Sequence, residues 1–127
     1  MNSYHISQGE GNTRVTLEAN IVGQDMVVVI TAGKAHVGAV ALAVPCEKNA
    51  EGVTASCSVL TVPGHRDNIP AERAAMRLCK LLQRPISVTA GLHIDKATEE
   101  EIQLLLENSE VVVENLMLSM RGEENGF

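Results

Sequence analysis

The first half of the chain consists largely of short segments in which apolar and polar side chains alternate or β-branched residues follow one another. Both patterns are typical of β-strands, and they predict strands at residues 13–20, 26–31, 38–44 and 54–62. The second segment, MVVVIT, has no polar side chain before its last position and indicates a strand buried on both faces. Because only a short polar break separates it from the first, these two segments are expected to form a hairpin.

The second half of the chain changes to the spacing of helices. Apolar residues three and four positions apart predict a helix that begins near residue 68, with Pro70 in its first turn and Pro85 beyond its end. Its apolar stripe is formed by Ala71, Ala74, Ala75, Leu78 and Leu82. Alternation returns at residues 86–93 and predicts a fifth strand.

Two more helices are predicted after this strand. Thr98 and Glu101 have the spacing of a capping box, and Ser109 can cap a third helix with its own apolar stripe. The order β-β-β-β-α-β-α-α predicts an α+β fold, with a mostly antiparallel sheet of about five strands and the helices packed on one face. Residues 1–127 form a single predicted domain, with loose ends at about 1–10 and 121–127. The Val- and Ala-rich strand faces offer a surface for a homo-oligomer.

Composition narrows the possible partners. The chain has a net charge of −6 with one Tyr, one Phe and no Trp, which argues against nucleic acid and anionic membranes as partners. It has no apolar run of membrane-spanning length and no secretory signal pattern, so a soluble cytoplasmic protein is expected. Its three cysteines include no CxxC pair, which fits a reduced compartment.

Three polar clusters lie where predicted elements end. The first, GKAHVG at residues 33–38, places Lys34 and His36 between Gly33 and Gly38. Glycines let the backbone turn tightly and present N–H groups to an anion. The same spacing is also typical of a plain connecting turn.

The second cluster, GHRDNIPAER at residues 64–73, surrounds the start of the first predicted helix. It contains His65, Arg66, Asp67, Asn68, Glu72 and Arg73. A helix N-terminus attracts anions, and His65 and Arg66 would add donors suited to a phosphate. The alternative is capping by Asp67 or Asn68 with ion pairs on a solvated surface, which accounts for some of these residues but not for all of them.

The third cluster is TAGLH at residues 89–93, where Thr89, Gly91 and His93 share the polar face of the last predicted strand. A glycine within a strand often marks the close approach of a ligand or of another backbone. If His36, His65 and His93 converge, they could bind a metal or contact a flavin-like ring and its phosphate. The sequence has no GxSxG, HExxH or GxGxxG motif, which weakens the case for an enzyme.

The three clusters together resemble one known family. The runs TAGKAHVGAV, GHRDNIPAER and SVTAGLHIDKAT are similar to the D-type accessory subunit of gallate-type non-oxidative decarboxylases, a prenylated-flavin chaperone, and the likeness extends over residues 26–120. The matching positions are Gly33, His36, Gly38, His65, Asp67, Asn68, Glu72, Arg73, Thr89, Ala90, Gly91 and His93. The chain has Ala39 where an acidic residue can follow the glycine in that family.

The resemblance implies that the chain binds reduced prenylated FMN, or FMN itself, and delivers it to a prenylated-flavin-dependent aromatic acid decarboxylase without catalysing the decarboxylation. Cofactor-binding residues would be found among these matched positions together with Lys34 and Arg66. Two alternatives stay open: a metal-dependent hydrolase that uses His36, His65, His93 and Asp67 as ligands or base, and a purely structural accessory subunit.

Overall fold

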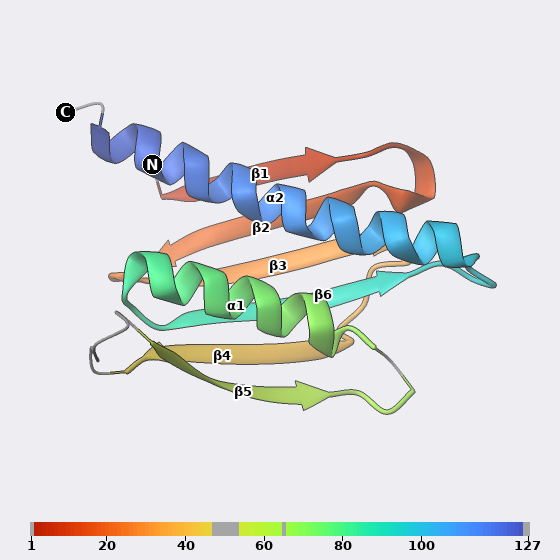
Figure 1. The fold of residues 1–127 in the computed structure, drawn as a ribbon, viewed down its shortest axis with the longest axis horizontal. Coiled ribbons are helices and arrows are strands. Elements are labelled where there is room, and N and C mark those ends of the chain that lie inside the picture. The colour runs from red at the N-terminus through yellow and green to blue at the C-terminus, as the bar shows by residue number, and fades with distance from the viewer. Residues whose placement is uncertain (1, 47–53, 65, 126–127) are drawn as a thin grey trace.

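The computed structural model describes residues 2–46, 54–64 and 66–125. Over these residues the chain forms one sheet of six strands and two α-helices (Figure 1). The elements in chain order are β1 (Ser3–Gln8), a short 3-10 helix (Gly11–Thr13), β2 (Val15–Val22), β3 (Asp25–Gly33), β4 (Ala39–Pro45), β5 (Ala55–Thr61), α1 (Asn68–Leu82), β6 (Ile86–His93) and α2 (Glu99–Asn125).

The sheet has the strand order β1-β2-β3-β6-β4-β5. β3 and β6 pair in parallel, and every other neighbouring pair is antiparallel, so the sheet is mixed. The predicted hairpin is β2–β3, in which Val22 pairs with Asp25 across a tight turn. α1 connects the β4–β5 hairpin to β6, which inserts between β3 and β4 at the centre of the sheet.

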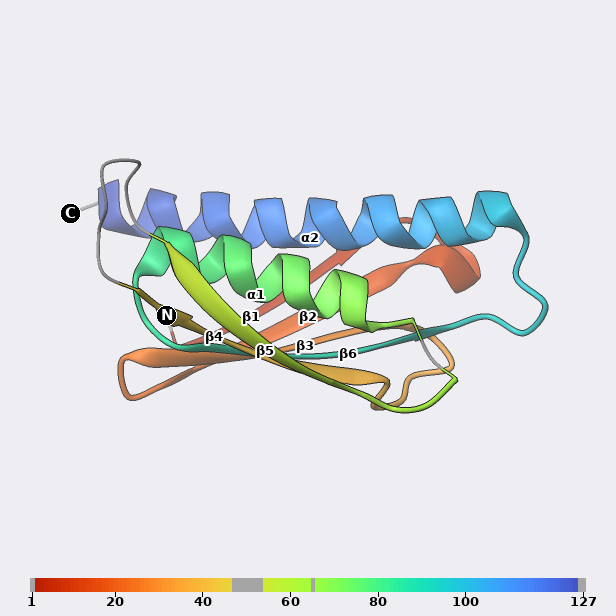
Figure 2. The same ribbon diagram turned by 60° about the horizontal axis from the view of Figure 1, so that its bottom comes forward.

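Both helices cover the same face of the sheet, as Figure 2 shows. α1 lies over β4, β5 and β6, and α2 lies over β1 and β2. Cross-strand partners such as Val28, Val88 and Ala41 are buried on this face, because successive side chains in a strand point to opposite faces. The α+β class and the placement of the helices on one face are therefore confirmed.

Small side chains set the distance between α1 and the sheet. Residues fully or almost fully buried here are Ala39, Ala41, Ala43, Ala71, Ala74 and Ala75. Because alanine has a small side chain, α1 can pack closely on β4. Larger core side chains, among them Leu17, Ile30 and Leu116, fill the rest of the interior.

The two predicted C-terminal helices are one continuous helix. The capping box is confirmed: the Glu101 N–H donates to Thr98 Oγ1 at 3.1 Å, and the Thr98 N–H donates to Glu101 Oε1 at 3.0 Å. Ser109, predicted to cap a third helix, lies inside α2 and donates its hydroxyl to the Leu105 carbonyl at 2.7 Å. A buried serine that bonds back to its own helix does not require a helix start.

Two further details differ from the sequence expectations. The N-terminal segment, expected to be loose, forms the edge strand β1, which pairs with β2 from Ser3 to Gln8. The MVVVIT segment is buried on one face only: Met26, Val28 and Ile30 are buried, whereas Val27 is exposed. Among the described residues, no helix lies on the opposite face of the sheet. A β-branched run does not by itself show whether a second layer covers a strand. Across the residues the structure describes, no helix combines the length and apolarity required to span a membrane.

Candidate functional site

Asp67, immediately before α1, is the centre of a polar cluster. Its side chain is buried, with 5% of the residue exposed. Oδ1 accepts the Leu92 N–H at 3.0 Å, and Oδ2 lies 3.1 Å from His36 Nε2. The Gly38 N–H donates to the Ala90 carbonyl, where β4 stops pairing with β6, and Leu92 presents the next N–H on that edge of β6. The Asp67 carboxylate therefore accepts the Leu92 N–H of β6 at a position where β4 no longer supplies a backbone carbonyl.

This geometry corrects the capping alternative for Asp67. Asp67 occupies the N-cap position of α1 but makes no side-chain capping hydrogen bond, because its carboxylate turns to β6 and His36. The start of α1 is consequently held by tertiary contacts rather than by a local cap. A cap-type residue in the sequence was not sufficient to identify this arrangement.

His36 is held in the segment between β3 and β4. Its Nδ1 lies 3.0 Å from the Lys34 carbonyl oxygen, while Nε2 faces Asp67. Bonds at both ring nitrogens fix the orientation of the imidazole. The ring of His93 lies edge-on to it, with 6.0 Å between the ring centroids and an interplanar angle of 89°. His36 and His93, two of the three histidines whose convergence the sequence left open, thus lie close together.

Three glycines allow the segments of this cluster to approach one another. An added Cβ at Gly91 would lie 1.6 Å from the His36 carbonyl oxygen, and one at Gly38 would lie 1.8 Å from Asp67 Oδ2. At Gly33, where φ is +61°, a Cβ would lie 2.1 Å from the His93 carbonyl oxygen. Their immediate neighbours are protein atoms, so packing by itself accounts for glycine at these positions. The prediction that these glycines bind cofactor stays a prediction.

Asp95 lies at the edge of the polar cluster and contacts two of the predicted site residues, Lys34 and His93. Its carboxylate lies 2.5 Å from Lys34 Nζ through Oδ2 and 2.9 Å from His93 Nε2 through Oδ1. The hydrogen bond from Lys34, followed by that from His93, lowers the pKa of Asp95 below its ordinary value. Asp95 was not among the sequence candidates. Its position two residues after His93 was a signal available in the sequence.

A cavity of about 330 Å³ adjoins the cluster. It lies between the first turns of α1 and α2 and the end of β6, and Arg66, Asp67 and His93 are among its lining residues. The remaining lining residues are Gly64, Ile69, Pro70, Leu92, Ile94, Ala97, Ile102, Leu105, Leu106 and Ser109. The cavity is therefore mostly apolar, with its charged groups concentrated beside the histidines. No sequence pattern pointed to it, because its walls come from three separate elements.

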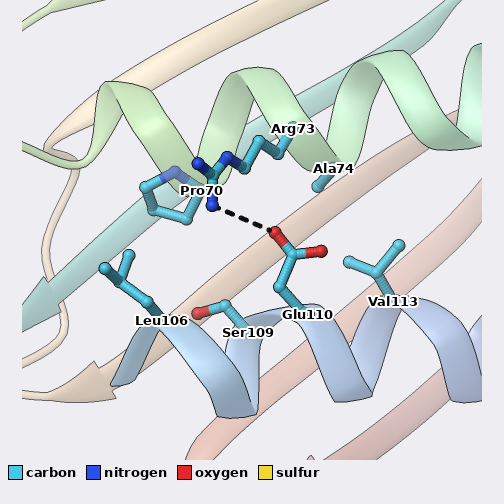
Figure 3. Close-up of a pocket in the computed structure, with 7 residues that line it drawn as sticks. All are labelled: Pro70, Arg73, Ala74, Leu106, Ser109, Glu110 and Val113. Carbon is cyan, nitrogen blue, oxygen red and sulfur yellow. Dashed lines mark ion pairs between the residues drawn. The ribbon is translucent and has the colours of Figure 1, made fainter. Parts of the chain in front are cut away.

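Three other candidates, Arg73, Glu72 and Thr89, lie away from the cluster. Arg73 points toward α2, where its Nη1 lies 3.6 Å from Glu110 Oε1 (Figure 3). Glu72 is exposed, and Thr89 lies on the uncovered sheet face beside Val29 and Val40. Asn68 begins α1 next to Asp67 and is half-buried. The small hollow drawn in Figure 3 lies between α1 and α2 and is separate from the histidine cluster.

Two of the three predicted metal ligands, His36 and His93, lie in the described part of the chain. His65, the third, lies outside the described residues. Over residues 2–46, 54–64 and 66–125, no group of three or more His, Cys, Asp or Glu side chains is arranged to hold a metal ion.

Comparisons with known proteins agree with the fold and identify the family. A chain from a chaperone complex for yeast 20S proteasome assembly has a TM-score of 0.58 with this structure, at 14% identity, over 97% of this chain and 98% of that one. At this identity the similarity establishes the fold alone. A comparison with curated proteins found no match.

Residues 9–121 match the family described as the prenylated flavin chaperone LpdD-like domain. The match includes all three polar clusters, α1 and most of α2. It agrees with the family resemblance of the three sequence runs. The chain therefore belongs to the prenylated flavin chaperone LpdD-like family.

Proposed function

We propose that this chain binds reduced prenylated FMN and delivers it to a prenylated-flavin-dependent aromatic acid decarboxylase. Membership of the flavin chaperone family supports the first step. The structural observation that carries the proposal is the junction between the polar cluster and the apolar cavity, since Asp67 and His93 belong to both. A flavin has the same division, with a largely apolar ring system, polar ring edges and an anionic phosphate.

The residues present fit such a ligand. Arg66 supplies positive charge for the phosphate, and His93, which lines the cavity, can approach the polar edge of the ring. Lys34, which pairs with Asp95, and His36, which is bonded at both ring nitrogens, hold the neighbouring groups of the site in position. The cavity, at about 330 Å³, is at the lower end of the range of about 300–1,000 Å³ for small-molecule pockets. It suits the ring system, with the ribityl phosphate extending toward Arg66. When bound, the cofactor would supply its flavin chemistry to the decarboxylase rather than to this chain.

Retention of the reduced cofactor tests this function. The purified chain, mixed anaerobically with reduced prenylated FMN and desalted, should keep the flavin in the protein fraction, as measured by absorbance. His36→Ala and His93→Ala should weaken binding by about tenfold or more, because each removes a polar contact in a partly buried site. His65→Ala tests the candidate outside the described residues and is expected to act in the same direction.

The control for these variants is His5→Ala, since His5 lies on β1 and is exposed. It should retain flavin as the unmodified chain does. Delivery is tested by adding the loaded chain to a cofactor-free decarboxylase and measuring decarboxylation. Failure of the unmodified chain to retain any reduced prenylated FMN would refute the proposal.

A metal at the histidine cluster is a separate question with its own measurement. His36 and His93 lie close enough to contribute to one site, and His65 is the third candidate. Metal content after purification, before and after loading with flavin, distinguishes a metal that accompanies the cofactor from a hydrolytic metal centre. A stoichiometric metal without flavin would favour the hydrolase alternative.

We also propose that the chain forms a homo-oligomer through the uncovered sheet face. Val27, Leu42, Val44 and Leu60 are exposed on this face, and Leu60 is 78% exposed. With six strands about 4.8 Å apart and about seven residues long, the face covers about 650 Å² per copy. Two copies would bury about 1,300 Å², which is within the range of stable interfaces. Most charged side chains lie elsewhere, so two acidic chains could pack here without strong repulsion.

A further inference from the structure

The cavity beside the histidine cluster has hydrocarbon walls at a position open to solvent. Ile69 in the first turn of α1 is 40% exposed, and Ile102 in the first turn of α2 is 48% exposed. Both line the cavity, opposite Leu92 and Ile94 at the end of β6. Leaving such side chains in water is unfavourable in proportion to their area, so this surface would gain from covering by an apolar ligand.

The charged groups and the imidazole of the cavity come from one part of its wall. Asp67 and His93 belong to the histidine cluster as well as to the cavity, and Arg66 directly precedes Asp67 in the chain. On the side of α2, the hydroxyl of Ser109 donates to the Leu105 carbonyl within its own helix at 2.7 Å. A charged or strongly polar ligand atom would therefore find its partners near Asp67. The α2 side is formed mainly by the apolar side chains of Ile102, Leu105 and Leu106, and the Ser109 proton is already donated within the helix.

We propose that the α2 side of this cavity holds the isoprenoid-derived carbons of the cofactor, so that the chain distinguishes prenylated FMN from plain FMN. This inference rests on the proposed function and adds the residues that set its specificity. Plain FMN would make the same polar contacts with Arg66 and His93 but would leave Ile102 and Ile69 uncovered. Because even one additional methylene in an apolar pocket changes discrimination by about tenfold or more, a preference of at least about tenfold is expected.

The test compares the dissociation constants of reduced prenylated FMN and reduced FMN, measured anaerobically by equilibrium dialysis. Ile102→Ser and, separately, Ile69→Ser should weaken binding of prenylated FMN while leaving that of FMN nearly unchanged, so that the preference falls toward equality. Neither residue belongs to the buried core, so the substitutions are expected to leave the fold intact, and circular dichroism checks this.

Leu118→Ser is the matched control. Leu118 is 52% exposed on the same helix, but about 24 Å farther along it, given a rise of about 1.5 Å per residue. It should keep the preference of the unmodified chain. Equal affinity of the unmodified chain for both flavins would overturn this inference and leave the proposed function intact. Parallel weakening of both flavins by the isoleucine variants would also overturn it, and binding of neither flavin would refute the proposed function together with it.

Discussion

Asp67 and Leu92 lie 25 positions apart in the sequence and are joined by a hydrogen bond of 3.0 Å from the Leu92 N–H to Asp67 Oδ1. This bond attaches the start of α1 to the edge of β6 just beyond the last residue that β4 pairs. The second carboxylate oxygen of Asp67, Oδ2, lies 3.1 Å from His36 Nε2 and so positions that imidazole. One buried carboxylate thus links the three segments that the sequence presented as separate clusters.

Removing this carboxylate should destabilise the fold. Asp67→Ala leaves the partly buried Leu92 N–H without its acceptor and should lower the free energy of unfolding by about 1–3 kcal/mol. Asp67→Asn retains an oxygen that can accept this bond and should cost less. Urea unfolding measures both variants. An alanine variant as stable as the unmodified chain would show that the bond contributes nothing to the fold.

Gly91 should not tolerate even a methyl group. Gly91→Ala would place a Cβ 1.6 Å from the His36 carbonyl oxygen, and the 34–38 segment would have to move away from β6. We expect a loss of about 1–3 kcal/mol in the free energy of unfolding, together with weaker flavin binding.

Gly122→Ala is the control for this substitution. Gly122 lies in α2 with open space around its Cβ position, and alanine is the better helix former there. Its free energy of unfolding should stay unchanged or rise slightly in the same measurement. Equal effects of the two substitutions would contradict the close approach of His36 to β6.

The carboxyl group of Asp95 should titrate below the ordinary range of aspartate, which is near pH 4. Since its pKa is lowered in the folded state, the stabilisation it provides is present above the unfolded pKa and is lost as the pH falls through the folded value. Lys34→Ala should raise the pKa toward the ordinary value, as measured by NMR titration. An unchanged pKa in this variant would contradict the contact between Lys34 and Asp95.

If the chain forms a homo-oligomer through its uncovered sheet face, a charge introduced on that face should disrupt it. Leu42→Glu places a carboxylate within the proposed interface and should shift the chain to a monomer, as measured by analytical ultracentrifugation. Leu118→Glu introduces the same charge on α2 and should leave the oligomeric state unchanged. If the unmodified chain were monomeric even at high concentration, the proposed interface would be contradicted.

The cysteines should differ in reactivity according to their burial. Cys46 is exposed, whereas Cys79 lies fully buried in α1, where burial raises the pKa of its thiol. A thiol reagent at neutral pH should modify Cys46 in the folded chain and Cys79 only after unfolding. Mass spectrometry of the labelled peptides distinguishes the two. Rapid labelling of Cys79 in the folded chain would contradict its buried position.

Periodicity and local capping signals were sufficient for most of the secondary structure. Alternation located β2 and β6, and the reciprocal bonds of Thr98 and Glu101 begin α2 where the sequence placed them. These features depend on neighbours along the chain, so the sequence contains them directly. The polar residues at element ends likewise indicated where the cluster lies. The approach of His36 to His93, which the sequence posed only as a condition, depends on how the segments pack in space.

Only the tertiary structure decided what these elements do to one another. Ser109 was read as a helix start because the sequence does not reveal that packing against the sheet keeps α2 continuous. Capping was one of two sequence interpretations of Asp67, and its actual partner, Leu92, comes from another element. The cavity could not be predicted at all, since Ile69, Ile94 and Ile102 become neighbours only when α1, α2 and the end of β6 pack together. Local patterns depend on spacing along the chain, whereas a binding site depends on distances through space that only packing determines.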